Sequence, residues 1–138
     1  MKLKIIAGIV SLLFLLIVSC QSDEQMEFNR YYSSGSLIYQ NHCQNCHGTN
    51  GEGLQGLIPS LKDSVYLRSN KSTLACLVKY GLKKNVTILK RSYDSEMPPN
   101  DLAPIQIANV LTYITNSFGN NMGTINSDEV DAGLGKCK

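Results

Sequence analysis

Residues 41–48, "NHCQNCHG", hold two cysteines three positions apart and a histidine directly after the second. Thiols at this spacing could bind zinc, act as a redox dithiol or attach a haem. A structural zinc site needs four ligands, usually from two such pairs, and the remaining cysteines of this chain stand alone. A thioredoxin-like dithiol would open a helix in a βαβ context, which the flanking residues do not resemble.

Haem attachment is the chemistry that gives all three residues a role. C-x-x-C-H is the pattern of c-type haem attachment, in which two thiols form thioethers with the haem vinyl groups. The adjacent histidine then reaches the iron from the proximal side. The motif therefore predicts one covalently bound haem c, held by Cys43, Cys46 and His47.

The N-terminus has the pattern of a secretory signal. Lys2 and Lys4 precede an apolar run over residues 5–18. A transmembrane helix needs roughly 20 apolar residues, and this run is shorter. An uncleaved membrane anchor stays open as the alternative.

The end of this segment, Ile17, Val18, Ser19 and Cys20, resembles the lipobox of bacterial lipoproteins. The resemblance implies cleavage after residues 1–19 and acylation of Cys20. Residues 20–32, which are polar and without periodicity, would then form a lipid-anchored tether. The remaining chain would lie in the cell envelope of a bacterium, in the periplasm or exposed at the outer membrane. An ordinary signal peptide with a chance cysteine is the alternative.

Composition indicates a folded domain without a strong net charge. The 138 residues allow at most one compact domain plus extensions, and 43% of them are hydrophobic. Removal of the predicted signal would take away Lys2 and Lys4 and leave 11 basic and 11 acidic residues. The net charge therefore gives no support for a nucleic-acid partner. One local cluster is basic, and it is either a solvated helix end and loop or a docking face for an acidic partner: Lys79, Lys83, Lys84, Lys90 and Arg91.

Residues 35–61 resemble the class I cytochrome c family. The family's glycine and aromatic residue before the motif, its glycines after it and its following proline are matched by Gly35, Tyr39, Gly48, Gly51, Gly53 and Pro59. The resemblance covers residues 33–118 and implies an all-α, cytochrome c-like fold of about four to five short helices around the haem. It also implies that the Pro59 carbonyl accepts a hydrogen bond from His47, which fixes the imidazole orientation.

The same resemblance assigns the distal ligand to Met97. The family's distal loop commonly reads Y-x-x-x-M-P, which Tyr93, Met97 and Pro98 match. Relatives often carry glycine three residues before the tyrosine, where this chain has Lys90. Met122 and His42 are the other candidates for the sixth ligand, although His42 directly precedes Cys43 on the proximal side.

Helix patterns agree with an all-α fold. Helices are predicted over residues 36–42, 72–81, 104–119 and 127–134 from capping residues and 3.6-residue periodicity. The family resemblance places the third across the first, with Tyr113 near Gly35 and Tyr39. Residues 86–89, "VTIL", resemble a strand by residue type, but the run is short and lacks an evident partner.

Two cysteines remain after these assignments. Cys76 and Cys137 form an even pair in an oxidising compartment, so we expect a disulfide that pins the C-terminal extension, residues 119–138, to the middle helix. Two free thiols or pairing between molecules are the alternatives.

These features predict an electron carrier that is not itself an enzyme. His47 and Met97 would fill both axial positions of the iron, which leaves no vacant site for oxygen or peroxide. We expect a monomeric, monohaem, membrane-tethered electron-transfer protein of a respiratory chain that meets redox partner proteins. The alternatives are a fixed haem-relay subunit of a larger oxidoreductase and a ligand-binding or peroxidatic haem protein, which requires Met97 to leave the iron.

Overall fold

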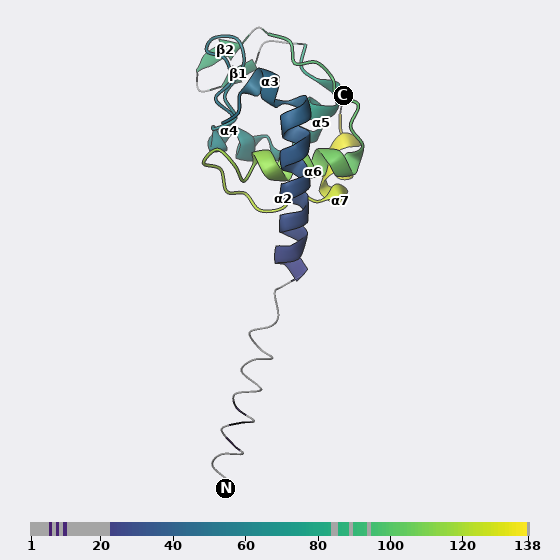
Figure 1. Cartoon of the computed structure of the whole chain (residues 1–138). Coiled ribbons are helices and arrows are strands. Elements are labelled where there is room, and N and C mark those ends of the chain that lie inside the picture. The colour runs from purple at the N-terminus through teal and green to yellow at the C-terminus, as the bar shows by residue number, and fades with distance from the viewer. Residues whose placement is uncertain are drawn as a thin grey trace.

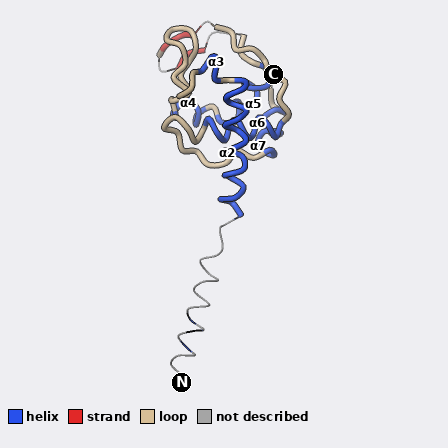
Figure 2. Tube along the Cα trace, viewed as in Figure 1, coloured by secondary structure: helices blue, strands red, loops and turns tan. Residues whose placement is uncertain are grey.

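The computed structural model describes residues 6, 8, 10, 23–83, 86–88, 90–93 and 95–137, and within these ranges the chain is mostly helical (Figure 2). The expected all-α fold is therefore confirmed. The proposed lipobox, Cys20 and Lys84 lie outside the described residues. The elements in chain order are α2 (Asp23–His42), α3 (Gln44–His47), α4 (Ser64–Ser69), the 3-10 helix η1 (Lys71–Thr73), α5 (Leu74–Tyr80), β1 (Val86–Ile88), β2 (Arg91–Tyr93), α6 (Pro104–Ile114) and α7 (Ser127–Leu134).

Helix α2 crosses α6 at Gly35 (Figure 1). A Cβ atom at Gly35 would collide with the Asn109 carbonyl and would lie 2.9 Å from the Cβ of Tyr113. The rings of Tyr39 and Tyr113 pack with their centroids 5.4 Å apart. The two helices thus approach each other where the chain has no side chain, as the family resemblance implied.

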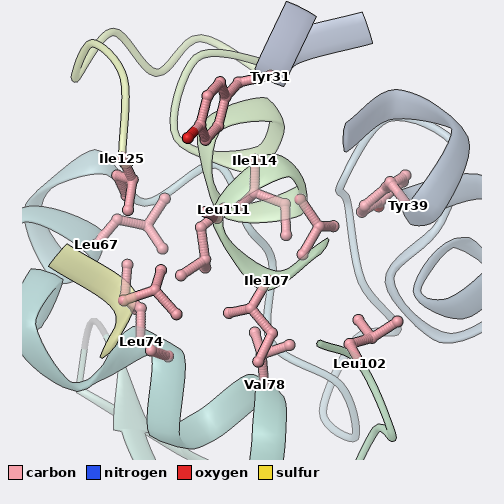
Figure 3. Close-up of a cluster of buried hydrophobic side chains, with 14 residues drawn as sticks. Tyr31, Tyr39, Leu67, Leu74, Val78, Leu102, Ile107, Leu111, Ile114 and Ile125 are labelled. Atoms are coloured by element: carbon pink, nitrogen blue, oxygen red, sulfur yellow. The ribbon is translucent and has the colours of Figure 1, made fainter. Parts of the chain in front are cut away.

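The core lies between α6 and the helices on either side of it. Ile107, Val110 and Leu111 on α6 are fully or almost fully buried. They face Leu74 and Val78 of α5, whose side chains point into the same cluster (Figure 3). The apolar residues that recur at helical spacing in this stretch of α6 therefore form the face that packs into the core. All residues of the described core fall between Tyr31 and Val130.

Helix α2 begins 13 residues earlier than the predicted helix over 36–42. Residues 23–32, which we expected to lack regular structure within a tether over residues 20–32, are helical, while the tethering role itself stays a prediction. Three aromatic side chains explain the difference: Tyr31 is buried, Phe28 stacks on Tyr32, and the Tyr32 hydroxyl bonds to Ser117 Oγ at 3.0 Å. The N-terminal turns of α2 project beyond the body of the protein (Figure 1).

Residues 86–88 and 91–93 form a short antiparallel hairpin. Strand β1 pairs with β2 in antiparallel register, with Val86 opposite Tyr93 and Ile88 opposite Arg91. The rejection of the "VTIL" strand was therefore wrong, because its partner "RSY" is too short and polar to show a strand pattern. Lys90 has φ of +63°, a left-handed conformation that glycine adopts more readily. That conformation accounts for the glycine that relatives often carry at this position.

Helix α6 ends at Ile114, before the predicted end at residue 119. Side chains take over its last carbonyls: Thr115 Oγ1 donates to Leu111 O at 2.7 Å, and Asn116 Nδ2 donates to Thr112 O at 2.8 Å. Asn120 Nδ2 donates to Ile114 O at 3.0 Å. Such local side-chain bonds compete with continued helix.

The ends of the middle helix also differ from the prediction. The stretch predicted as one helix from residue 72 begins with η1 and continues as α5 to Tyr80. The preceding α4 was not predicted. Its N-cap is Asp63, whose carboxylate accepts from the amides of Val65 and Tyr66 at 3.1 Å. Six residues are too few for a helical period to be visible in the sequence.

The C-terminal extension folds onto the middle of the domain. Its helix α7 has the bounds predicted from sequence, with Asn126 as N-cap. Cys76 on α5 and Cys137 form a disulfide across a sequence separation of 61 residues. The extension is thereby joined covalently to the helix that also carries Leu74 and Val78.

In the ranges that the structure describes, no helix combines the length and the apolar character needed to cross a membrane.

Gly35→Ala tests the contact of α2 with α6. In an exposed helix this change would stabilise by about 1 kcal/mol. Here we expect it to lower the free energy of unfolding by about 2 kcal/mol or more, because the new methyl group overlaps the Asn109 carbonyl. Guanidinium chloride unfolding measures the effect, with Ser33→Ala on an exposed position of α2 as the control. A stabilised Gly35→Ala variant would contradict the close contact.

Candidate functional site

One cavity collects the residues that the sequence singled out. Cys43, Cys46, His47, Pro59 and Met97 all line it, although His47 and Met97 are 50 residues apart. Its walls are mainly apolar, with side chains from the loop after α3, from α5 and from α6. They include Leu57, Ile58, Leu61, Leu74, Val78, Leu82, Ile88, Leu111 and Ile114.

A single helical turn positions the motif. Cys43 is the N-cap of α3, and the amide of His47 donates to the Cys43 carbonyl at 2.9 Å. Residues three and four positions apart in a helix share one face, so Cys43, Cys46 and His47 all turn toward the cavity. Both cysteines are free thiols, with Cys43 half-buried and Cys46 exposed.

The loop after α3 folds back onto the histidine. The amide of Gly53 donates to the His47 carbonyl at 2.8 Å, and the amide of Leu61 donates to the Gly51 carbonyl at 2.8 Å. This return places the Pro59 carbonyl 3.2 Å from His47 Nδ1. Gly53 permits the approach, because a Cβ there would strike the backbone carbonyls of Ile58 and Pro59.

The environment of His47 favours a neutral imidazole. Burial lowers its pKa below the usual range, although the Pro59 carbonyl acts in the opposite direction. If Nδ1 carries the proton and donates to Pro59, Nε2 is left as a lone-pair donor. A neutral ring with one oriented lone pair is the form in which histidine binds a metal.

The end of α3 is tied to α2 by a buried phenol. Tyr39 is 1% exposed, and its hydroxyl donates to the Gly48 carbonyl at 2.6 Å. Burial raises the pKa of Tyr39 above its usual range, so the hydroxyl keeps its proton and remains a donor. The helix crossing at Gly35 is thus connected to the turn that carries His47.

Met97 is held by its backbone. Its amide donates to the Leu82 carbonyl at 2.9 Å, and the Leu82 amide donates to the Met97 carbonyl at 2.9 Å. Gly81, at φ of +71°, lies directly against this pair, since a Cβ there would collide with the Met97 carbonyl. These reciprocal hydrogen bonds fix the backbone of Met97, which lies in the loop between the hairpin and the two prolines that follow.

The structure places the other candidates away from the cavity. His42 is exposed at the end of α2, and Met122 packs against the core while its amide donates to Asn116 Oδ1 at 3.0 Å. Tyr93 is buried in β2, but it is not among the described residues that line the cavity. The sequence reasoning missed Leu82, which has no motif of its own and acts through its backbone.

The cavity has few charged side chains and a mainly apolar lining. Asp63 and Glu96 are the carboxylates among its described lining residues, against a long apolar wall. Burial raises the pKa of the Cys43 thiol to about 11, so before any modification it is protonated at neutral pH. Within the described ranges, no group of three or more His, Cys, Asp and Glu side chains is arranged to hold a metal ion by itself. The arrangement suits a flat apolar group bonded by two sulfurs and faced by an imidazole and a thioether.

Comparisons with known proteins agree with this geometry. A family model described as cytochrome c matches residues 32–117, which include the whole motif, Pro59 and Met97. The chain is also similar to the fructose dehydrogenase cytochrome subunit of Gluconobacter japonicus, with 28% identity over 103 residues. That alignment covers 71% of this chain and 21% of the relative, so the chain spans about a fifth of the relative's length.

Gly81→Ala tests how Met97 is positioned. We expect a loss of about 2–4 kcal/mol in the free energy of unfolding, from left-handed strain together with the overlap on the Met97 carbonyl. Amide hydrogen exchange should quicken at Leu82 and Met97. Gly56→Ala is the matched control, because Gly56 also has positive φ but has open space around it. Equal losses in both variants, with unchanged exchange at Met97, would show that strain alone acts.

Proposed function

Because the chain belongs to the cytochrome c family, we propose that it carries one covalently bound haem c and transfers electrons between redox partner proteins. The observation that carries the proposal is the convergence of Cys43, Cys46, His47 and Met97 on a single apolar cavity. The family supports covalent haem and a role in electron transfer. A single haem per chain rests on the single C-x-x-C-H motif.

The residues of the cavity fit such a group. Cys43 and Cys46 would supply the thioethers, and His47 and Met97 would bind the iron. The apolar walls match the faces of a porphyrin, which needs burial away from water. A haem held there supplies one-electron chemistry.

The protein residues orient the ligands and limit access. The Pro59 carbonyl holds the His47 ring in one orientation, and the Leu82 backbone fixes the backbone of Met97, which lines the same cavity. If His47 and Met97 both bound the iron, they would leave no open position for a substrate, and the site would favour electron exchange over ligand binding. A thioether ligand and an apolar surrounding would both favour the reduced iron and raise its potential.

We also propose that the protein is a lipoprotein of a bacterial cell envelope. Support comes from the sequence alone: the basic and apolar N-terminus followed by Ile17, Val18, Ser19 and Cys20. A lipid on Cys20 would confine the domain near a membrane and raise its effective concentration for partners there. Metabolic labelling with a radioactive fatty acid tests the anchor, since Cys20→Ser should abolish incorporation.

A fixed relay within a larger oxidoreductase is the second candidate. It is favoured by the likeness to a protein named as the cytochrome subunit of a fructose dehydrogenase. Under this alternative the chain would copurify in constant ratio with a dehydrogenase partner after mild membrane extraction. A mobile carrier would separate from its partners, and rates would depend on its concentration.

The haem proposal predicts one covalent haem and a ligand that can be removed. Protein made with a working cytochrome maturation system should have the mass of the polypeptide plus one haem. Met97→Ala should keep that haem, because the thioethers remain, but lose the long-wavelength band of thioether-bound ferric iron. The reduced variant should then bind carbon monoxide, while the parent protein does not.

Met122→Ala is the matched control for the distal ligand. It removes a half-buried methionine that packs on the core outside the cavity, so it should leave both the band and carbon monoxide exclusion intact. Loss of the band in Met122→Ala and its retention in Met97→Ala would overturn the ligand assignment. A protein with the mass of the bare polypeptide would overturn the haem proposal itself.

Salt dependence of electron transfer tests the basic docking face. Lys83, Lys90 and Arg91 are exposed beside Leu82 and Ile88, which line the cavity, whereas Lys79 Nζ bonds to the Leu102 carbonyl at 3.0 Å. With an acidic partner, the second-order rate should fall by about tenfold as ionic strength rises. Changing Lys83, Lys90 and Arg91 to Gln should flatten that dependence, and Arg30→Gln on the projecting part of α2 should not. Rates insensitive to salt and to all these changes would remove the basic docking face.

A further inference from the structure

The segment that follows α6 lies against the loop that carries Pro59. Asn120 is 6% exposed, and its Nδ2 donates to the Leu61 carbonyl at 2.8 Å and to the Ile114 carbonyl at 3.0 Å. One side-chain amide thus joins the end of α6 to a residue 59 positions earlier in the sequence. Leu61 and Ile114 both line the cavity that collects the motif residues, so this link joins two parts of its wall.

A second residue of the segment, Phe118, meets the same loop at Gly51. A Cβ atom at Gly51 would lie 2.5 Å from the nearest ring carbon of Phe118, so the ring lies directly against the backbone there. Phe118 has φ of +60°, a conformation that residues other than glycine rarely adopt. Its ring also packs on Tyr39 and Tyr113, with centroid distances of 5.3 Å and 5.7 Å. The left-handed turn therefore brings one large ring into contact with α2, α6 and the loop.

These two contacts act on the hydrogen bonds that close the loop. The Leu61 amide donates to the Gly51 carbonyl at 2.8 Å, and Ser60 Oγ donates to the same carbonyl at 2.9 Å. Asn120 binds the carbonyl of Leu61, whose amide closes the loop. Phe118 covers Gly51, whose carbonyl accepts that amide. The segment after α6 therefore holds the closed loop from two sides.

The closed loop determines where the Pro59 carbonyl lies. Pro59 directly precedes Ser60, and its carbonyl is 3.2 Å from His47 Nδ1. We propose that Asn120 and Phe118 are positioning residues for His47. They hold the loop, and hence the Pro59 carbonyl, against the imidazole ring. The inference rests on the proposed function, but it concerns residues that come after residue 117, where the match to the cytochrome c family ends.

The Asn120 side chain acts on the described part of the protein as a donor. Nδ2 has two carbonyl partners, whereas the buried Oδ1 has no partner among the described protein groups. A leucine at this position would keep a side chain of similar size and would remove both donated bonds. Asn120→Leu therefore separates the donor from the filling of space.

The Pro59 carbonyl affects the iron through the electron density of the imidazole. Donation of the Nδ1 proton to a carbonyl makes the ring a more basic ligand, which favours the oxidised iron. If the loop loosens and this bond is weakened, the ring donates less and the midpoint potential rises. General loosening that admits water to the cavity has the opposite effect, because a wetter surrounding favours the more highly charged oxidised state. The direction of the shift thus separates positioning of His47 from a general loss of packing.

Asn120→Leu in the haem-loaded protein tests the positioning role. We expect a midpoint potential above that of the parent protein. In the reduced protein, NMR should show about three- to tenfold faster exchange of the Leu61 amide proton and of the His47 Nδ1 proton. Phe118→Leu, which shortens the side chain against Gly51, should shift the potential in the same direction. It carries the same test if Asn120→Leu does not fold.

Asn116→Leu is the matched control from the same segment. The Asn116 side chain bonds to backbone groups of Thr112, Met122 and Gly123, which belong to α6 and the extension and not to the loop. This variant should be less stable than the parent protein. It should nevertheless keep the parent's midpoint potential and the parent's exchange rate at Leu61.

Three results would overturn the inference while the proposed function stands. They are an unchanged or lower potential in Asn120→Leu and Phe118→Leu, an equal rise in Asn116→Leu, and equal acceleration of exchange at Leu61 and at Leu111 of α6. The last would report a loss of global stability only. A parent protein without covalent haem would instead overturn the proposed function, and this inference with it.

Discussion

The contact between α2 and α6 at Gly35 is the constraint on which the site depends. It lets the α2 backbone meet the Asn109 carbonyl, and it brings Tyr39 and Tyr113 into a cluster of aromatic rings with Phe118. Tyr39 then donates to the Gly48 carbonyl, directly after the turn that carries His47. A contact between two helices that are far apart in the sequence thus fixes the position of the motif, which follows the end of α2.

Backbone carbonyls, more than side chains, position the chemical groups of the site. The Pro59 carbonyl faces His47, the Gly48 carbonyl receives Tyr39, and the Leu82 backbone pairs with Met97. At Gly53 and Gly81 a methyl group would displace one of these carbonyls. The glycines of such a site are required by the path of the backbone. For this reason the glycines and the proline of the sequence indicate the path of the chain around the site.

The sequence predicted correctly those parts of the protein in which residue types and their spacing allow one interpretation. Residues 127–134 form α7 as predicted, and the motif residues share a cavity with Met97. It failed where tertiary contacts decide. Residues 23–32 are helical because aromatic side chains of this segment pack on α6. The hairpin turn was not predicted because its left-handed position is occupied by Lys90, whereas a glycine there would have indicated a turn. Leu82 could not be predicted, because its role lies in its amide and carbonyl.

The uninterrupted α2 has a consequence for where electrons can be exchanged. At 1.5 Å per residue its 20 residues are about 30 Å long, and Cys43 follows the last of them. A chain held at the N-terminal end of this helix would carry its redox centre on a stiff spacer, at the far end from the point of attachment. Electron tunnelling requires close approach of two cofactors, so a partner must present its own cofactor at that height along the spacer. If the chain is anchored in this way, the length of α2 would restrict its partners to those whose cofactor lies at the matching distance from the point of attachment.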